Sequence, residues 1–306
     1  MGASKILVIG SINMDLVLRV AYIPQVGETL LGRSVERIPG GKGANQAVTA
    51  AKLGASVTML GKVGGDEFGV PLLDNLRETG VNTARIELIS AASSGLAVIQ
   101  VNDEGDNSIV VLAGANELAD KDYIVANEDL IEEAEMVILQ MEIPHEAVYQ
   151  AVELASKHRK TVILNPAPAP DFIPDAVLSK LDYLIPNESE LHKLSGQPVD
   201  SITAAEDAAK VLLSKGVRNV IVTLGSSGSL YVSASGTVHV PARAVKAVDT
   251  TAAGDSYVAA FAVGLSEGKS VQEAIAFATK VSSIVVTKAG AQTSIPDRRE
   301  VDLLTQ

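Results

Sequence analysis

The sequence contains no cysteine, so it offers no disulfide framework, no thiolate nucleophile and no cysteine-ligated zinc site. It has no basic run, and 37 acidic against 25 basic residues give a formal charge of −12, which disfavours nucleic acid and anionic membranes as partners. No run of about eighteen apolar residues is present, and the N-terminus lacks both a signal-peptide core and a complete myristoylation pattern. We therefore expect a cytoplasmic protein without a membrane span.

Short apolar segments rich in β-branched residues alternate with amphipathic segments along the chain. The predicted strands are 5–11, 56–61, 136–142, 161–167, 183–187 and 219–225, and the predicted helices between them are 144–158, 188–196 and 203–216. Strands that alternate with helices imply crossover connections and a sheet covered on both faces. The fold class we expect is α/β, a three-layer αβα arrangement around a mostly parallel central sheet.

Two segments break this alternation. Residues 15–41 and 95–114 have the pattern of strand pairs without helices, and the second contains a polar turn at 102–107. We expect them to form a small sheet, from about 13–41 and 95–114, that acts as a lid beside the α/β core. No Pro- or Ser-rich linker divides the chain, so a single domain over 1–306 is predicted.

Several familiar motifs are incomplete. "GLSEGKS" (264–270) is one residue short of a P-loop and follows a helix, and Ser270 with Glu273 has the spacing of a capping box. "GGKGANQ" (40–46) does not complete the dinucleotide-binding pattern, "GSSGS" (225–229) misses the serine-hydrolase spacing, and no HExxH is present. P-loop, Rossmann, metalloprotease and serine-hydrolase readings are thereby disfavoured.

The glycine-rich segment "GGKGANQ" is informative in another way. Its glycines let the backbone approach a ligand closely, Lys42 adds a cation, and a helix is predicted to begin near Ala44. Asn45 and Gln46 are polar residues in an otherwise Ala-rich helix, which favours ligand contacts. The alternative is a plain turn before a helix.

Polar residues also follow the ends of predicted strands, where ligands gather in open parallel sheets. Asn13 and Asp15 would project to the same side of an extended chain and suit a diol, although ordinary turn chemistry is the alternative. Glu142 directly follows a strand, and it would either face a ligand or cap the next helix. Asn187 and Glu190 have capping-box spacing but would also suit Mg²⁺ held through water.

Two further loops have open alternatives. The Gly/Ser loop at 223–229 would form either a hairpin turn or a nucleotide contact. The stretch "AVDTTAAGDSY" (247–257) leads into a helix whose unpaired N–H groups attract anions, yet it places Asp255 in that first turn. Asp255 would be either a carboxylate that stabilises the helix dipole or a catalytic group.

With these residues assembled, the chain resembles the ribokinase-like carbohydrate kinases, the phosphofructokinase-B family, from its first strand to "GAQTSIP". "GGKGANQA" is similar to the N-terminal signature of that family and "DTTAAGDSYVAAF" to the C-terminal one, with Ala252 where many members have Gly. "GSINMD" with "GGKGAN" is most similar to the members that phosphorylate ribose. The resemblance implies transfer of a phosphoryl group from MgATP to the 5-hydroxyl of ribose.

The resemblance also implies residue roles. Asp255 would be the base, and the N–H groups of Ala252, Ala253 and Gly254 would form an anion hole. The sugar would be bound by Asn13, Met14, Asp15, Gly41, Lys42, Gly43, Ala44, Asn45, Glu142 and Asp255. The ATP site would be lined by Asn187, Thr223, Leu224, Gly225, Ser226, Ser227, Gly228, Gly254, Asp255 and Thr279. Mg²⁺ would be held through water by Glu190 and Asn187, and K⁺ by Asp249, Thr251, Val285, Lys288, Gly290 and Ser294.

Two other functions stay open on the sequence. The first is a kinase for another sugar or a nucleoside, such as fructose, 2-deoxyribose or adenosine, although the polar sugar set favours a bare, hydroxyl-rich sugar. The second is a non-catalytic sugar-binding protein, which would have no need of Asp255 beside Gly254. The resemblance further implies a homodimer formed through the lid.

Overall fold

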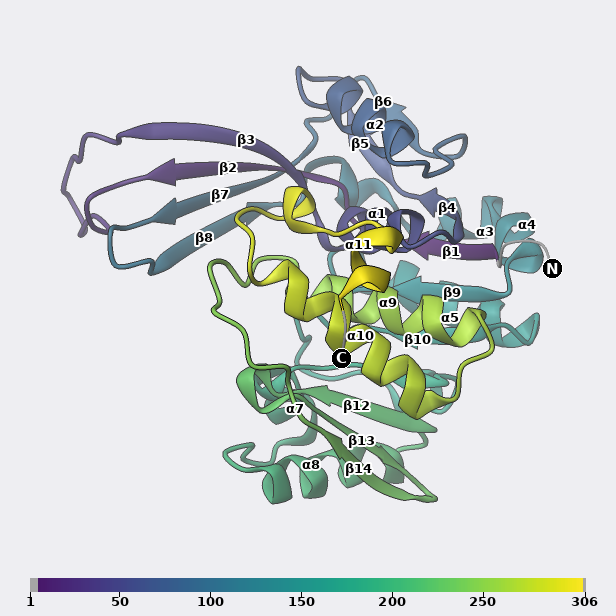
Figure 1. Ribbon diagram of the computed structural model, residues 1–306. Helices are drawn as coiled ribbons and strands as arrows, with labels where there is room; N and C mark the ends of the chain where they lie inside the picture. Colours follow the sequence, from purple (N-terminus) through teal and green to yellow (C-terminus); the bar gives the residue numbers. More distant parts are fainter. Residues whose placement is uncertain (1–4, 305–306) are drawn as a thin grey trace.

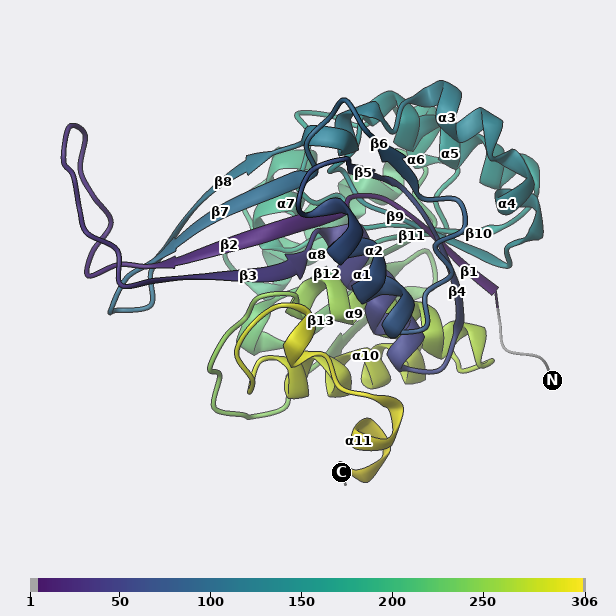
Figure 2. The same ribbon diagram turned by 90° about the horizontal axis from the view of Figure 1, so that it is seen from above.

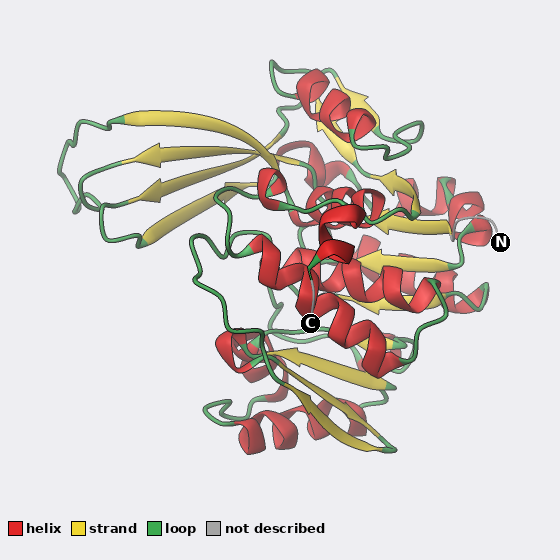
Figure 3. Ribbon diagram, viewed as in Figure 1, coloured by secondary structure: helices red, strands yellow, loops and turns green. Residues whose placement is uncertain are grey.

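The computed structural model describes residues 5–304, which form a central sheet with helices on both faces (Figure 1, Figure 3). Within this range the sheet has eight strands in the order β14-β13-β12-β11-β10-β9-β1-β4. Its strands from β4 to β12 pair in parallel, and β13 and β14 extend it as antiparallel neighbours. The bounds are β1 (Lys5–Ile9), β4 (Ser56–Leu60), β9 (Met136–Leu139), β10 (Thr161–Leu164), β11 (Tyr183–Leu184), β12 (Asn219–Thr223), β13 (Ser229–Ser233) and β14 (Gly236–Val240).

The strands alternate their side chains between two hydrophobic cores, as strands buried on both faces must. In β1, Leu7 and Ile9 belong to one core, whereas Ile6 and Val8 belong to the other. The first core is covered by α3 (Lys121–Ala126), α4 (Glu128–Glu133), α5 (His145–Lys157), α6 (Asp175–Leu178), α7 (Glu188–Ser195) and α8 (Ile202–Ser214). The second is covered by α1 (Lys42–Lys52), α2 (Gly69–Glu78), α9 (Ala253–Ser266), α10 (Val271–Val285) and α11 (Arg298–Leu303). The predicted three-layer α/β class is confirmed.

A second sheet, the lid sheet, projects from the body of the molecule (Figure 1, Figure 2). Its strand order is β3-β2-β7-β8, where β2 (Asn13–Arg19) and β3 (Ser34–Gly40) form one antiparallel pair and β7 (Gly95–Val101) and β8 (Asn107–Leu112) form the other. The two pairs are joined by parallel pairing of β2 with β7. Pairing across about 80 residues of sequence therefore depends on the body, which brings the starts of both strands together.

The sequence did not predict several of the short elements. The strands β5 (Lys62–Gly64) and β6 (Glu87–Ile89) form a separate parallel pair, and three residues are too few to show a period. Three short 3₁₀ turns are η1 (Gly114–Leu118), η2 (Gly225–Ser227) and η3 (Gln292–Ser294). None of the helices within residues 5–304 is long and apolar enough to cross a membrane.

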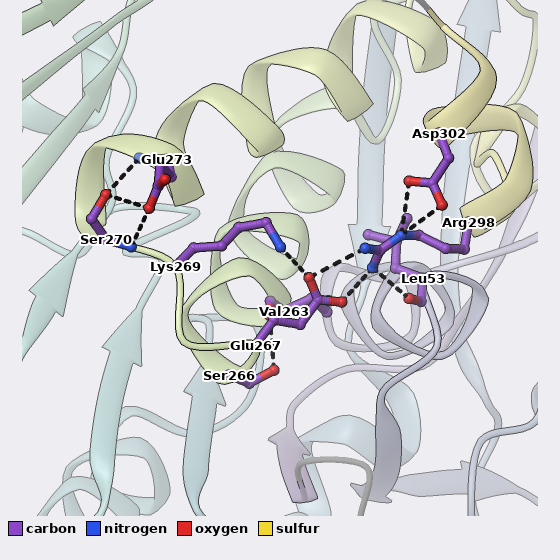
Figure 4. A network of polar contacts seen from close by, with 9 residues as sticks. All are labelled: Leu53, Val263, Ser266, Glu267, Lys269, Ser270, Glu273, Arg298 and Asp302. Carbon is purple, nitrogen blue, oxygen red and sulfur yellow. Dashed lines mark hydrogen bonds and ion pairs between the residues drawn. The ribbon is translucent and has the colours of Figure 1, made fainter. Parts of the chain in front are cut away.

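An ion-pair network fastens α11 to the helices that carry the site (Figure 4). Glu267, which follows α9, accepts hydrogen bonds from both Lys269 and Arg298. Arg298 also pairs with Asp302 at 3.1 Å and donates to the carbonyl oxygen of Leu53 at the end of α1 (3.4 Å). One guanidinium therefore joins three helices. The adjacent Ser270 begins α10 with the capping box that the sequence predicted.

Candidate active site

The polar residues that follow the central strands meet at the carboxyl edge of the sheet, where ligands bind in open α/β folds. A cleft of about 210 Å³ opens at this edge. It is lined by Lys42, Asn165, Ala167, Ile185, Asn187, Glu190, Thr223, Thr250, Ala252, Gly254, Asp255 and Val258. The structure thus brings residues from four separate predicted site segments to one place.

Helix α1 begins at Lys42, so its predicted start near Ala44 was two residues late. The N-cap residue, Gly41, has a φ of 89° and no side chain to cap the helix. Distant groups accept instead: the N–H of Lys42 donates to Oε2 of Glu142 (3.1 Å) and that of Ala44 to the carbonyl of Ser11 (2.9 Å). The Ser11 hydroxyl donates to the same Glu142 oxygen (2.6 Å). Glu142 therefore serves the first turn of α1, and tertiary contacts set where that helix starts.

Asp255 lies in the first turn of α9, and only 7% of it is exposed. Ala252, the N-cap residue, has a φ of 60°, a left-handed conformation that turns the preceding loop sharply into the helix. Both carboxylate oxygens accept amide hydrogens from α1: Oδ2 from Asn45 (2.9 Å) and Oδ1 from Gln46 (3.3 Å). Packing between the first turns of two helices thus orients the carboxylate in the cleft that it lines.

Of the backbone groups next to Asp255, the N–H of Ala253 already has a hydrogen-bond partner, whereas the space around Gly254 is open. The N–H of Ala253 donates to the carbonyl oxygen of Thr250 (3.2 Å), so this member of the predicted anion hole already has a partner. Gly254 lines the cleft, and a β-carbon placed there would meet no atom within 4 Å. The missing side chain therefore leaves room for a ligand to approach the N-terminus of α9.

Lys42 lies among four carboxylates. The charge of Asp255 is the largest influence that raises the pKa of Lys42, burial lowers it, and Glu142, Glu190 and Asp15 raise it further. The pKa of Asp15 is raised to about 7, mainly by burial. Repulsion from Glu142 and Asp255 raises this pKa further, and the positive charge of Lys42 lowers it. Burial likewise raises the pKa of Glu190. Such an excess of acceptors over donors suits a ligand rich in hydroxyl groups.

Asn13 and Asp15 are both buried at the start of β2, and the intervening Met14 packs in the hydrophobic core. The amide of Asn116 in η1 donates to Oδ1 of Asn13 (2.7 Å), and its own oxygen accepts the N–H of Ile12 (2.9 Å). Asn116 therefore holds the turn from β1 into the lid sheet. Because β2 is extended, alternation puts Asn13 and Asp15 on one side of the strand and Met14 on the other.

Asn187, Glu190 and Thr223 line the other part of the cleft. Oδ1 of Asn187 accepts the N–H of Glu190 (2.9 Å), and Oε2 of Glu190 accepts the N–H of Asn187 (2.9 Å). The capping box that the spacing permitted is therefore present at the start of α7. Both residues of the capping box also line the cleft, so Asn187 and Glu190 can cap the helix and face a ligand at the same time.

The loop after β12 is a hairpin turn into β13, one of its two predicted alternatives. The N–H of Leu224 donates to the carbonyl oxygen of Gly228 (2.8 Å), and Leu224 is buried in the core. Gly228 has a φ of 95° and lies so close to the Val240 carbonyl that no β-carbon would fit. Of the loop residues predicted to contact the nucleotide, Thr223 lines the cleft. The other described members of that set do not: Leu224, Gly225, Ser226, Ser227 and Gly228.

Thr279, predicted near the nucleotide, lies on α10. Its hydroxyl donates to the carbonyl oxygen of Ile275 within the helix (2.9 Å) and also interacts with the Tyr257 hydroxyl. Tyr257 in turn donates to the hydroxyl of Ser229 (2.9 Å), and burial raises its pKa. Thr279 is partly buried beside the buried hydroxyls of Tyr257 and Ser229, and it is not among the residues that line the cleft.

Asp249 ties two loops together near the start of α9. Its Oδ1 accepts the N–H (2.8 Å) and hydroxyl (2.6 Å) of Thr251, and its Oδ2 accepts the N–H of Gly290 (2.9 Å). Burial raises the pKa of Asp249, but these hydrogen bonds outweigh it and leave the pKa lowered. The structure therefore brings together three of the six residues predicted around a monovalent cation.

The other three residues of that set have separate contacts. Val285 is buried in the core, the Lys288 amine pairs with Glu300 (2.6 Å), and the Ser294 hydroxyl donates to the carbonyl of Ala291 (2.7 Å). Within residues 5–304, no group of three or more His, Cys, Asp or Glu side chains is placed to hold a metal ion. Asp249 is the one carboxylate in this predicted set of six residues.

Several buried polar residues near the predicted site residues were not predicted from the sequence. Ser11, Gln140 and Asn165 each follow an apolar strand closely, the same signal that identified Glu142. Asn116 and Gln292 lie in short 3₁₀ turns, and no local pattern marks them. All five side chains reach residues distant in the sequence, which a local pattern does not report.

Three comparisons relate this chain to known proteins. It matches the model described as pfkB family carbohydrate kinase over residues 3–298. A ribokinase from Bacillus subtilis is 43% identical over 300 residues, 98% of this chain and 99% of that protein. A deoxyribokinase from Salmonella typhi is 42% identical over 292 residues, 95% of each chain. The structure of an Arabidopsis thaliana ribokinase complexed with ribose and ATP is 33% identical, covers 98% of both chains and has a TM-score of 0.90.

The fold and the cleft define the class, a three-layer α/β enzyme with a small β-sheet lid and a polar cleft at the carboxyl edge of its sheet. The chain belongs to the pfkB family of carbohydrate kinases. It is an ATP-dependent sugar kinase, as the resemblance in the sequence implied.

Proposed function

We propose that this protein is a ribokinase, which transfers the γ-phosphoryl group of ATP to the 5-hydroxyl of D-ribose. The observation that carries the proposal is the buried carboxylate of Asp255, held by two amides at the N-terminus of α9 beside the open position at Gly254. The similarity to a ribokinase from Bacillus subtilis and to the ribose- and ATP-bound ribokinase of Arabidopsis thaliana supports ribose as the acceptor.

In this mechanism Asp255 accepts the proton of the sugar hydroxyl while the hydroxyl oxygen forms a bond to the γ-phosphorus. The bond from that phosphorus to the bridging oxygen breaks, and ADP leaves with the electron pair. Backbone donors at the start of α9, at Ala252 and Gly254 above all, stabilise charge on the transferring group. Lys42 adds positive charge at the same cleft. Position and charge, more than covalent chemistry, lower the barrier.

The sugar lies on the lid side of the cleft in this proposal. Asn13 and Asp15 offer buried amide and carboxylate groups for the hydroxyls, Glu142 offers a partly buried carboxylate, and the side chains of Lys42 and Asn45 complete the set. Met14 and Ala44 are buried in the core, so they would contribute through their backbone alone. The lid sheet would close over the sugar and exclude water, which otherwise competes as the acceptor.

The phosphates of ATP would run from Gly254 toward Asn187 and Thr223, where the cleft wall is polar. Glu190 is a single carboxylate in that wall, which suits Mg²⁺ because this ion keeps most of its waters. When bound, Mg²⁺ would neutralise phosphate charge. The Asp249 carboxylate, which joins the loops before α9 and after α10, suits a monovalent cation such as K⁺ that would brace the anion-binding turn.

A second candidate acceptor is 2-deoxyribose, because a deoxyribokinase is about as similar to this chain as the ribokinases are. The two sugars differ by one hydroxyl group. A buried carboxylate such as Asp15 would lose a hydrogen-bond donor with the deoxy sugar, which favours ribose. Fructose and adenosine are weaker candidates, since the cleft presents carboxylates and amides where an adenine ring would need an apolar pocket.

The decisive experiment couples ADP release to a panel of sugars and nucleosides, with and without K⁺, for the wild type and Asp255→Asn. Turnover fastest with ribose supports the proposal, and a preference for 2-deoxyribose would replace it with the second candidate. Asp255→Asn is expected to bind ribose and ATP normally and to lose at least about 100-fold in kcat. Wild-type turnover in that variant would rule out the base.

We also propose that the lid sheet pairs with a second copy of the chain. The four residues Ile109, Val110, Val111 and Leu112 of its edge strand β8 are each more than half exposed, an unusual apolar edge for a monomer. Val111→Lys should shift the protein toward monomer in sedimentation experiments. Phe172→Lys, at an exposed apolar residue on another surface, is the matched control, and equal behaviour of both variants would contradict the lid interface.

A further inference from the structure

We propose that Gln46 is a positioning residue that holds the Asp255 carboxylate in its reactive orientation, and that Gln140 in turn fixes the amide of Gln46. The inference rests on the proposed function, because it takes Asp255 to be the base. It adds two residues that do not line the cleft and that reach the reaction only through another side chain.

The orientation of Gln46 follows from a backbone group that is only an acceptor. The carbonyl oxygen of Ile185 accepts from Nδ2 of Asn165 (2.9 Å), so Oδ1 of Asn165 must face Gln46. Nε2 of Gln46 therefore donates to that oxygen (3.2 Å) and to Oδ1 of Asp255 (3.3 Å). Because Nε2 carries two hydrogens, each of these acceptors receives one of them.

Gln140 completes the arrangement from the end of β9. Its Nε2 donates to Oε1 of Gln46 at 2.6 Å, and both side chains are fully buried. In the described part of the chain, Oε1 of Gln140 has no hydrogen-bond partner, and it lies against Gly10, where a β-carbon would come within 1.9 Å of it. An unpaired buried acceptor destabilises a fold, so the side-chain orientation of Gln140 that serves Gln46 lowers stability.

This chain of amides differs in role from Asn45, which donates to the other oxygen of Asp255. Both hydrogens of the Gln46 amide are used, and its oxygen already accepts, so Gln46 has no donor left for a sugar. Asn45 is part of the proposed sugar site. Gln46 therefore acts on catalysis through the carboxylate alone, and its loss should lower kcat more than it raises KM.

The test compares Gln46→Met, which keeps the length of the side chain but removes the donor, with the wild type in steady-state kinetics over a range of pH. We expect kcat to fall about 10- to 100-fold while KM for ribose changes less than about 3-fold. The acidic limb of kcat should move to higher pH, because a donor to a carboxylate favours its charged form. Gln46→Glu should move the acidic limb to still higher pH than Gln46→Met does, since a second carboxylate beside Asp255 disfavours its charged form.

The matched control is Thr49→Val, one helical turn along α1 and equally buried, which removes a hydroxyl near Ser256 but no bond to the carboxylate. It should lose thermal stability and keep its kcat and pH profile. Gln140→Leu removes one unpaired acceptor and leaves Oε1 of Gln46 unpaired instead, so its melting temperature should stay close to wild type. Its kcat should still fall about 3- to 10-fold.

Wild-type kcat and an unmoved pH profile in Gln46→Met would overturn the inference. If that variant does not fold, Gln140→Leu decides in the same way. Failure of the proposed function has a different signature, because Asp255→Asn would then keep its turnover. An inactive Asp255→Asn together with a wild-type-like Gln46→Met would contradict the positioning role alone.

Discussion

The side-chain amide of Asn45 donates a hydrogen bond of 2.9 Å to Oδ2 of Asp255, between residues that are 210 positions apart in the sequence. Oδ1 of Asn45 in turn accepts from the amide of Gln292 (3.2 Å), which itself accepts from Asn75 (2.6 Å). A series of hydrogen-bonded amides, partly buried at Asn75 and buried at Gln292 and Asn45, therefore runs from α2 through η3 to the proposed base. It couples the position of one carboxylate to the packing of four segments.

Truncation of this line at Asn45 should affect stability and turnover together. In Asn45→Ala, Asp255 and Gln292 each lose a buried partner, which should cost about 1–3 kcal/mol of unfolding free energy. Turnover should fall as well, because the carboxylate loses one of its two donors. Chemical denaturation of the two single variants and of Asn45→Ala/Asp255→Asn measures the coupling. Strictly additive losses would contradict a direct interaction.

Asp15 should make the protein less stable as the pH rises. Its pKa is about 7 in the folded protein against an ordinary value of 3.8, so the folded state binds a proton more tightly than the unfolded chain. The unfolding free energy should therefore decrease between about pH 4 and pH 7, and the full penalty should be present above pH 7.

Asp15→Asn should remove that penalty. We expect it to raise the unfolding free energy by on the order of 2 kcal/mol at pH 8 and to have little effect at pH 4. Its affinity for the sugar should fall, because a charged acceptor is lost. Thermal unfolding at both pH values checks the stability, with exposed Glu132→Gln as the control. Equal shifts at pH 4 and pH 8 would argue against titration of Asp15.

Gly254→Ala should separate folding from phosphoryl transfer. The added methyl group meets no protein atom within 4 Å, and alanine is a better helix former than glycine, so the melting temperature should be unchanged or slightly higher. The methyl would occupy the space at the N-terminus of α9, and kcat should fall by about 10-fold or more. A variant with normal turnover would show that the phosphoryl group does not approach at this position.

Glu267 should stabilise the protein above acidic pH. Burial raises its pKa, but hydrogen bonds from Arg298 and Lys269 outweigh this and lower it overall, so its contribution is present above the ordinary value of 4.5 and is lost as the pH falls through the lower folded value. Glu267→Gln should cost about 1 kcal/mol at pH 7 and nothing near pH 3. Activity should persist, since Asp255 lies about 18 Å away along α9.

The control for this prediction is Asp74→Asn, which removes an exposed ion pair with Arg77. Urea denaturation of both variants at pH 7 gives the comparison. The exposed pair should contribute close to nothing, because water screens it. If Glu267→Gln were as stable as wild type at pH 7, the network in Figure 4 would not fasten α11.

Much of the architecture was predictable because strands and helices depend on the spacing of apolar and capping residues close together in the sequence. The predicted strand segments 136–142 and 161–167 contain β9 and β10, and Ser270 with Glu273 identified the start of α10. The start of α1 was predicted two residues late. Its first N–H groups are satisfied by Ser11 and Glu142, which lie far away in the sequence.

The sequence by itself determined the class of the protein, because strand and helix periods and two long motifs are local and survive without knowledge of contacts. It also placed Asp255 and Gly254 side by side on a helix start. Only the tertiary structure decided how the carboxylate is held. The amides of Asn45 and Gln46, the orientation set by Gln140 and the raised pKa of Asp15 all arise from groups that become neighbours only when the chain folds. Burial and charge proximity are properties of that packing, so no sequence pattern contains them.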